Sequence, residues 1–429
     1  MNVCVFGLWH LGSVTSACLA KLGHQVTGLD FDQEVIKSLK KAKAPLHEPG
    51  LNELLQEQIQ AGRLLFSADP SKAIKKAQVL WLTFDTPVNE RDVADIKFLE
   101  NNFKKIMPYI NAGTGIVVSS QAPVGFVGRI EKEFKKQFPN KKCYFAASPE
   151  NLKLGKALDA FLNPDRIIIG VRDQQSKEML LPLFSSITQR LEWMRVESAE
   201  MTKHAINSFL ALSVCFANEV ASICEQVGAD AKEVERGLKT EVRIGPKAYL
   251  KPGVAFSGGT LARDINFLTD LSDMHQLPAF LIRSVNQSNA FHKTWIERKC
   301  RELLGSLKGK TIAILGLTYK PGTDTLRRSF AIEIAQALHA KGARVIGFDP
   351  AIKSIPKLLS KVIDLKHSVK EALDADIIVI AVECPEFLAM DEAIIDLMKN
   401  KIIIDPNGFM AKLVADKGLN YVFVGKGIL

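Results

Sequence analysis

The sequence lacks the marks of several protein classes. Its seven cysteines include no CxxC pair, so neither a zinc site nor a thioredoxin-like redox motif is predicted, and no metal is expected. No apolar run reaches the length of a membrane span, and Met1 leads directly into the strand-like Val3–Phe6 without the basic start and apolar core of a signal peptide. We therefore expect a cytoplasmic protein with no membrane partner.

Positive charge is in excess but is not concentrated in one block. The formal net charge is +9, and the lysines and arginines spread over many helical stretches. Net charge informs on solubility and association rather than on fold, so a small dianionic substrate or a solvated surface explains the balance equally well. No nucleic-acid partner is predicted.

Short apolar runs alternate with helical patterns in the first half of the chain. The runs cover residues 2–6, 25–29, 79–82, 115–118, 143–146 and 166–169. Alternation of this kind is typical of an α/β fold with a largely parallel, doubly wound sheet.

The second half begins with helix and then repeats the opening pattern. A helical stretch runs from about Ser198 to Leu238, and helical segments resume after a Gly/Pro-rich stretch from Ile244 to Gly259. Strand-like residues 310–316, 344–349, 377–380 and 402–404 follow. We predict two Rossmann-like doubly wound parallel-sheet domains joined by a central helical domain, with boundaries at 1–195, 196–300 and 301–429.

The first strand runs into a turn suited to a dinucleotide. Such a turn needs glycines where the backbone approaches a pyrophosphate, and an acid about 20 residues later for the ribose hydroxyls. Asp30 ends the second strand, and no basic residue follows it directly, which favours NAD over NADP. The turn reads Gly7, Leu8, Trp9, His10, Leu11, Gly12, with Trp9 at the place of the middle glycine.

Several further motifs occur in a fixed order along the chain. They are His47-Glu48-Pro49-Gly50-Leu51, Asp85-Thr86-Pro87, Ser120-Gln121-Ala122-Pro123-Val124-Gly125, Ser148-Pro149-Glu150-Asn151-Leu152, Glu200 through Lys203 to Asn207, Arg243-Ile244-Gly245-Pro246, Tyr249-Leu250-Lys251-Pro252-Gly253 and Gly316-Leu317-Thr318-Tyr319-Lys320-Pro321. With them the chain resembles the UDP-glucose/GDP-mannose dehydrogenase family over nearly its whole length.

This resemblance implies an activity and its partners. Members of the family oxidise the C6 alcohol of a nucleotide hexose twice with NAD, the second time through a cysteine thioester. For this chain the resemblance implies an NAD-dependent dehydrogenase acting on a nucleotide sugar, most simply a UDP-hexose. It also implies a homodimer formed through the central helix.

The resemblance assigns roles to residues of this sequence. The expected catalytic residues are Glu150, Lys203, Asn207, Thr260 and Asp264. The expected cofactor contacts are the turn residues from Gly7 to Gly12, Asp30, Thr86, Gln121, Arg263 and Arg327. The expected substrate contacts are Leu152, Lys153, Lys203, Asn207, Arg243, Tyr249, Gly253, Phe256 and Lys320. Residue types agree in part, since Lys203 and Asn207, four apart, share one helix face.

The sequence departs from the family pattern at the nucleophile. The family segment reads Gly-Gly-Ser-Cys, whereas this chain has Ser257-Gly258-Gly259-Thr260, with threonine in the place of the cysteine. A threonine hydroxyl is a far poorer nucleophile than a thiol at neutral pH. Cys215 on the central helix could in principle replace the missing nucleophile. The simpler interpretation is that Cys215 is a buried core residue.

Three hypotheses follow from this departure. The chain is a dehydrogenase that stops at the aldehyde or completes the oxidation without a thioester, or it is an NAD-dependent epimerase, or it is a silent nucleotide-sugar-binding homologue. Because the polar set around Lys203 and Glu150 is retained, we favour the first.

Overall fold

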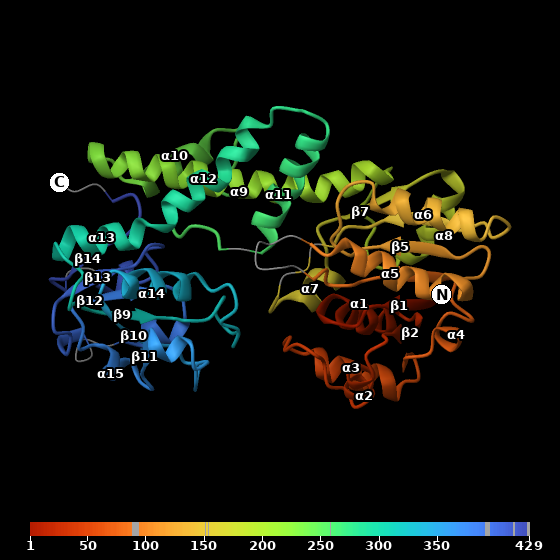
Figure 1. Cartoon of the computed structure of the whole chain (residues 1–429), viewed down its shortest axis with the longest axis horizontal. Coiled ribbons are helices and arrows are strands. Elements are labelled where there is room, and N and C mark those ends of the chain that lie inside the picture. Colours follow the sequence, from red (N-terminus) through yellow and green to blue (C-terminus); the bar gives the residue numbers. More distant parts are fainter. Residues whose placement is uncertain are drawn as a thin grey trace. The chain divides into compact units, whose positions relative to one another are not determined.

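The computed structural model describes residues 1–87, 94–150, 152, 154–257, 259–390, 395–414 and 417–426. The chain divides into two compact units, Met1–Ala205 and Ile206–Leu429. The long helix α9 (Val196–Val227) begins in the first unit and continues into the second. Each unit contains one largely parallel sheet with helices around it (Figure 1). This confirms the predicted α/β class with two Rossmann-like sheets, joined in the sequence by a helical region.

The first unit contains an eight-stranded sheet in the order β3-β2-β1-β4-β5-β6-β7-β8. All neighbouring strands are parallel except β6 and β7, which are antiparallel. Its strands are β1 (Asn2–Phe6), β2 (Gln25–Leu29), β3 (Leu64–Ser67), β4 (Val79–Leu82), β5 (Gly115–Val118), β6 (Tyr144–Ala147), β7 (Ile167–Val171) and β8 (Leu191–Arg195). The central strands are wholly buried, because helices cover both faces.

The helices of this unit alternate with the strands, as the sequence pattern predicts. They are α1 (His10–Lys21), α2 (Gln33–Leu39), α3 (Leu51–Gln60), α4 (Pro70–Ala73), α5 (Ile96–Ile106), α6 (Phe126–Gln137), α7 (Ala157–Leu162) and α8 (Gln174–Ser185). Aspartate side chains cap the amino ends of α2, α5 and α8 by accepting backbone N–H groups there. These caps fix where each crossover helix starts, and so where the loops at the strand ends lie.

The second unit contains a helical segment followed by a six-stranded parallel sheet in the order β11-β10-β9-β12-β13-β14. The helices before the sheet are α10 (Ala231–Thr240), α11 (Thr260–Met274), α12 (Phe280–Lys293) and α13 (Trp295–Leu304). The sheet and its helices are β9 (Thr311–Leu315), α14 (Phe330–Ala340), β10 (Arg344–Phe348), β11 (Ile363–Leu365), α15 (Val369–Ala372), β12 (Ile377–Ile380), β13 (Ile402–Ile404), α17 (Ala411–Val414) and β14 (Asn420–Val422).

Helix α9 is the one helix in the described part of the chain that is long and apolar enough to cross a membrane by length and composition. The sequence alone does not predict a membrane-spanning run at this helix. Its buried Asn207 and Asn218 hydrogen-bond to other segments of the protein, and 44% of the most apolar window is buried inside the structure. Satisfied polar groups of this kind are typical of a core helix.

Candidate active site

The turn between β1 and α1 needs both of its outer glycines. Gly7 has a φ of 97°, and an added Cβ would lie 2.7 Å from the ring of Phe84. At Gly12 an added Cβ would lie 1.8 Å from the backbone oxygen of Gly7. Only glycine at both positions lets the helix start this close to the strand, which is how a dinucleotide turn brings a pyrophosphate to a helix N-terminus.

Trp9 stands at the middle position of the turn and is the N-cap residue of α1, without a capping hydrogen bond from its side chain. Its φ of −76° lies in the ordinary negative range, so the backbone does not require glycine here. The indole is 47% exposed, whereas the neighbouring Leu8 and Leu11 are buried. The substitution therefore adds an aromatic side chain at the surface of the turn and leaves the packing beneath it intact.

Glu48 links this turn to a distant segment and was assigned no role from the sequence. Its carboxylate lies 2.9 Å from Nε2 of His10 and accepts hydrogen bonds from the backbone N–H groups of Gly155 (2.9 Å) and Ala157 (2.8 Å). The side chain is almost fully buried. A buried carboxylate with three partners is a positioning group, and it joins the cofactor turn to the chain that follows Glu150.

Asp30 and Asp349 occupy equivalent places in the two sheets but differ in what they can still bind. Asp30 Oδ2 accepts the N–H of Leu8 (2.7 Å) and Oδ1 that of Asp32 (3.0 Å), and the residue is half-buried. Asp349 is buried, and its Oδ2 accepts three hydrogen bonds, from Leu317 N and from both N and Oγ1 of Thr318.

Each oxygen of a carboxylate has about two acceptor directions. Asp30 therefore keeps capacity for the two ribose hydroxyls of a dinucleotide, whereas Oδ2 of Asp349 is saturated. The residues of the first turn fit NAD, and a carboxylate at this place repels the 2′-phosphate of NADP.

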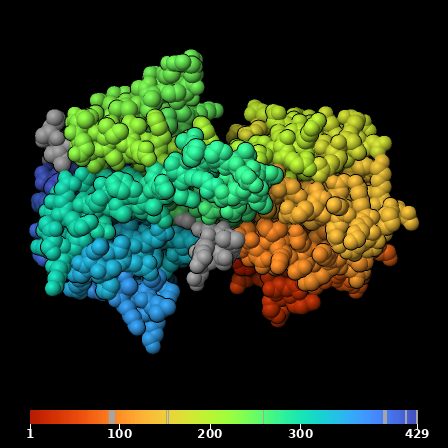
Figure 2. Space-filling model, turned by 45° about the horizontal axis from the view of Figure 1, so that its top comes forward, coloured from red at the N-terminus to blue at the C-terminus, as the bar shows by residue number. Residues whose placement is uncertain are grey.

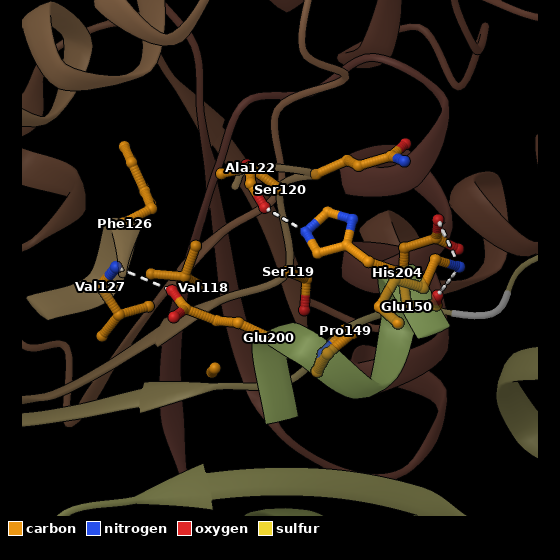
Figure 3. A pocket seen from close by; sticks show the side chains of 13 residues that line it. Val118, Ser119, Ser120, Ala122, Phe126, Val127, Pro149, Glu150, Glu200 and His204 are labelled. Atoms are coloured by element: carbon orange, nitrogen blue, oxygen red, sulfur yellow. Dashed lines mark hydrogen bonds and ion pairs between the residues drawn. The ribbon is translucent and has the colours of Figure 1, made fainter. Parts of the chain in front are cut away.

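A pocket opens at the carboxyl ends of β5 and β6, where α/β sheets bind ligands (Figure 3). Its empty volume is about 410 Å³, including its open mouth. The segment after β5 supplies Gln121, whose backbone oxygen accepts a hydrogen bond from Thr86 Oγ1 at 2.5 Å. Two of the predicted cofactor residues are thus in contact at this pocket.

Glu150 and Lys203 meet in the wall of the same pocket. Nζ of Lys203 donates to the backbone oxygen of Glu150 at 2.5 Å and lies 3.8 Å from its carboxylate Oε1. Oε2 of Glu150 accepts the N–H of Leu152 at 2.5 Å. The ammonium side chain is 13% exposed, so it is poorly hydrated beside a carboxylate, which strengthens its interaction with any oxyanion formed there.

Two further pocket residues, which carried no predicted role, hold its walls in place. Glu200 accepts the N–H groups of Gly125 (2.6 Å) and Val127 (2.9 Å) at the start of α6, and burial raises its pKa. Nε2 of His204 lies 3.0 Å from the oxygen of Ala122 and donates to it, since a carbonyl only accepts. Both contacts join α9 to the segment after β5, and Figure 3 shows them across the pocket.

The other predicted catalytic residues lie in the second unit. Asn207 is one helical turn after Lys203 on α9, and its Nδ2 donates to Asp264 Oδ2 on α11 at 2.5 Å. Asp264 is fully buried. Thr260 is the first residue of α11, one turn before Asp264, and it is exposed.

All seven cysteines lie in the described part of the chain, and each one is buried. Burial raises the pKa of Cys18, Cys300 and Cys384 to about 12 and that of Cys143 to about 11. Burial also raises the pKa of Cys215, whose Sγ donates to the backbone oxygen of Val285 at 3.4 Å. A buried thiol with a raised pKa supplies almost no thiolate, so Cys215 is a core residue and not a substitute nucleophile.

The remaining predicted residues fall into two groups, those held in place by other parts of the fold and those exposed at the surface. Gly253 and Phe256 lie in one loop held by buried side chains, whereas Arg263 is the neighbour of Asp264 on α11.

Arg243 is exposed and pairs with Glu241 at 2.8 Å, and Tyr249 is also exposed. Lys320 and Arg327 are exposed at the turn after β9. Lys153 lies outside the described residues.

The fold and the site together define a nicotinamide-dependent oxidoreductase. The chain has two largely parallel sheets, a glycine turn beside an aspartate that retains acceptor capacity for ribose, and an ammonium beside a carboxylate at the strand ends. Comparison with known proteins gives the family. Residues 1–188 match the NAD binding domain of the UDP-glucose/GDP-mannose dehydrogenase family, residues 197–291 its central domain and residues 313–412 its UDP binding domain. The chain belongs to this family, and it is an NAD-dependent nucleotide-sugar dehydrogenase.

Individual relatives match along the whole chain. The UDP-glucose 6-dehydrogenase of Rhizobium meliloti (strain 1021) is 32% identical over 99% of this chain and 100% of its own length. That of Rickettsia typhi (strain ATCC VR-144 / Wilmington) is 35% identical over 100% of both chains. The solved structure of a UDP-glucose dehydrogenase from Pyrobaculum islandicum has a TM-score of 0.88 at 27% identity, covering 99% of this chain and 97% of that one.

Proposed function

We propose that the protein oxidises the C6 hydroxymethyl group of a UDP-hexose resembling UDP-glucose, and that it forms no thioester. The reaction either stops at the aldehyde or continues through the aldehyde hydrate. The observation that supports this most strongly is the Lys203–Glu150 pair in a chain whose seven cysteines are all buried. Bound NAD would supply the hydride acceptor.

The roles of the two residues follow from their charges. The Lys203 ammonium stabilises the alkoxide that develops when the C6 hydroxyl loses its proton, because a poorly hydrated cation interacts strongly with new negative charge. Glu150 accepts that proton, directly or through water, since its carboxylate lies in the pocket wall and is partly exposed.

Oxidation of the aldehyde needs an oxygen nucleophile if no thiol takes part. Water adds to the aldehyde carbon to give a gem-diol, and loss of one diol proton with hydride transfer leaves the acid. Glu150 or Asp264 serves as the base in this step. The Asn207 amide, held by Asp264, is a neutral donor on the same helix as Lys203.

We assign the rest of the predicted site in the same way. Residues 1–195 bind the dinucleotide through the turn from Gly7 to Gly12 and Asp30, with Thr86 and Gln121 at the pocket. Residues 196–300 supply the catalytic helix and the sugar loop, and residues 301–429 bind the nucleotide diphosphate. Lys320 is the proposed cation for the diphosphate, with Arg243 as a second candidate. Arg263 and Arg327 are proposed as further cofactor contacts.

We also propose a homodimer formed through α9. Phe209, Phe216 and Ile223 are 66%, 47% and 62% exposed and are spaced by seven residues, so they form one stripe along the helix. The helical segment of the second unit, green to blue-green in Figure 2, lies at the surface in that view. A self-complementary apolar stripe on a long helix suits pairing with a second copy of the same chain about a twofold axis.

Ligand binding and product analysis test the substrate assignment. Thermal unfolding is measured with NAD, NADP, UDP-glucose, UDP-N-acetylhexosamines and GDP-mannose, because a ligand that binds the folded state raises the midpoint. We expect shifts with NAD and UDP-glucose and smaller ones with NADP and GDP-mannose. Incubation with NAD and UDP-glucose should give the C6 aldehyde or acid by mass spectrometry. An isomerised sugar with no net NADH would contradict the proposal.

A further inference from the structure

The loop that contains Gly253 and Phe256 has no regular secondary structure, and side chains from elsewhere in the fold hydrogen-bond to the backbone groups of Gly253, Val254 and Phe256. The N–H of Gly253 donates to Oδ1 of Asn218 at 2.9 Å, and the oxygen of Gly253 accepts from Nε2 of His292 at 2.7 Å. Asn218 and His292 are both buried. Two side chains from two different helices, α9 and α12, therefore hold the two backbone polar groups of Gly253, one on each of its flanking peptide units.

The next residues of the loop are held in the same manner. The N–H of Val254 donates to Oδ1 of Asn407 at 2.9 Å, and Asn407 follows β13 in the second sheet. The amide of Asn289 pairs with both backbone groups of Phe256, accepting at 3.0 Å and donating at 2.8 Å. Four side chains thus fix three residues, and we refer to Asn218, Asn289, His292 and Asn407 as the loop clamp.

Asn407 approaches the loop so closely at position 253 that any side chain there would displace the Asn407 amide. A Cβ added to Gly253 would lie 2.1 Å from Oδ1 of Asn407. Glycine at this position therefore preserves the hydrogen bond between the Val254 N–H and Asn407. Asn407 is the clamp member that lies between strands β13 and β14 of the second sheet, while the other three come from helices that precede this sheet in the sequence.

Simple stabilisation of an irregular loop would be served by backbone turns or water. Here the side chains of three asparagines and one histidine are used instead, and two of the three residues they hold, Gly253 and Phe256, are those expected to contact the sugar. A backbone fixed before binding loses less conformational entropy when it recognises a ligand. The arrangement therefore serves recognition by the loop backbone.

We propose that the loop clamp positions Gly253 to Phe256 for the hexose of the substrate, and that Asn407 couples the UDP-binding domain to this sugar loop. The inference rests on the proposed function. Its four residues are positioning residues, since each acts through the loop backbone.

The test compares binding of UDP-glucose and of UDP to the full-length protein by calorimetry, alongside KM, kcat and the unfolding midpoint. Asn407→Ala removes the acceptor of the Val254 N–H, and we expect the Kd and KM for UDP-glucose to rise about tenfold. The Kd for UDP should stay within about twofold, because UDP lacks the hexose. Asn407→Asp keeps an acceptor oxygen and should restore most of the affinity. Asn420→Ala, an exposed asparagine of the same domain, is the matched control and should change neither constant.

His292→Gln provides an independent test if Asn407→Ala does not fold. The glutamine amide can reach Gly253 as a donor, so UDP-glucose affinity should be largely retained, whereas His292→Leu should lose it with UDP binding unchanged. Equal losses for UDP and UDP-glucose, or a folded Asn407→Ala variant with wild-type constants, would overturn the clamp. Failure of the wild-type protein to bind UDP-glucose would instead refute the proposed function on which it rests.

Discussion

The Nζ of Lys203 lies 2.5 Å from the backbone oxygen of Glu150 and 3.8 Å from its carboxylate. The two residues are 53 positions apart in the sequence. They meet because β6 ends just before Glu150 and the first turns of α9 pass the same sheet edge. An ammonium and a carboxylate in one pocket wall form a charge pair that can stabilise an alkoxide and receive its proton.

Removal of this ammonium should abolish turnover without affecting the cofactor. For Lys203→Ala we expect kcat to fall by about 10²–10³-fold, because charge stabilisation in a poorly hydrated site is lost. The Kd for NAD, measured by calorimetry, should remain near the wild-type value, since Lys203 pairs with Glu150 at the pocket whereas Asp30, the proposed ribose ligand, follows β2. Lys37→Ala removes an exposed helical lysine and is the control. Unchanged turnover in Lys203→Ala would show that Lys203 is not a catalytic residue.

Native protein should resist thiol reagents. At pH 8 a buried thiol with a pKa of about 12 is ionised to roughly one part in ten thousand, and the reagent cannot reach it. NADH production after an hour with iodoacetamide should equal that of untreated protein, whereas all seven cysteines should alkylate in denaturant. Rapid inactivation with one modified cysteine by mass spectrometry would reveal a reactive thiol and contradict the account.

Thr260→Cys should gain what the wild-type protein lacks. Position 260 is exposed at the N-terminus of the 15-residue helix α11, where the helix dipole lowers the pKa of a thiol. The variant should become sensitive to iodoacetamide, and oxidation of the aldehyde to the acid should accelerate. Thr260→Ser retains a hydroxyl and should gain neither property. If the Thr260→Cys variant does not react with iodoacetamide and oxidises the aldehyde no faster than the wild type, position 260 takes no part in the reaction.

The central helix provides a test of assembly. Phe216→Glu places a carboxylate in the middle of the exposed stripe on α9, where burial against a second copy would leave the charge unpaired. We expect light scattering to give a dimer for the wild-type protein and a monomer for the variant. Leu358→Glu, at an exposed apolar residue between β10 and β11, is the matched control for added negative charge. A variant that remains dimeric would place the interface elsewhere.

The sequence predicts the inner strands of both sheets but does not predict the edge strands. The strands absent from the prediction are β3, β8, β11 and β14, which are the outermost strands of the two sheets. An edge strand is partly exposed and carries polar residues, as Glu192 and Arg195 show in β8, so its apolar run is broken. Strands buried on both faces give continuous apolar runs and are found.

The sequence predicts the role of a site residue when that residue belongs to a known motif. It misses the role when the role depends on contacts with residues far away in the sequence. Lys203 and Asn207 share a helix, so their spacing is informative. Glu48 was visible within a motif, but its bonds to Gly155 and Ala157 span more than 100 residues. The loop clamp joins residues from α9, α12 and the end of β13, and periodicity along the chain carries no information about such pairings.

The count of NADH formed per UDP-glucose in a single turnover, with intact-protein mass spectrometry of the quenched reaction, tests the central claim most directly. The account predicts rapid formation of about one NADH, a slow or absent second one, and unmodified protein throughout, because hydride transfer from the alcohol needs no thiol and oxidation of the aldehyde lacks one. Two NADH formed rapidly together with a sugar thioester trapped on any of the seven cysteines would contradict it.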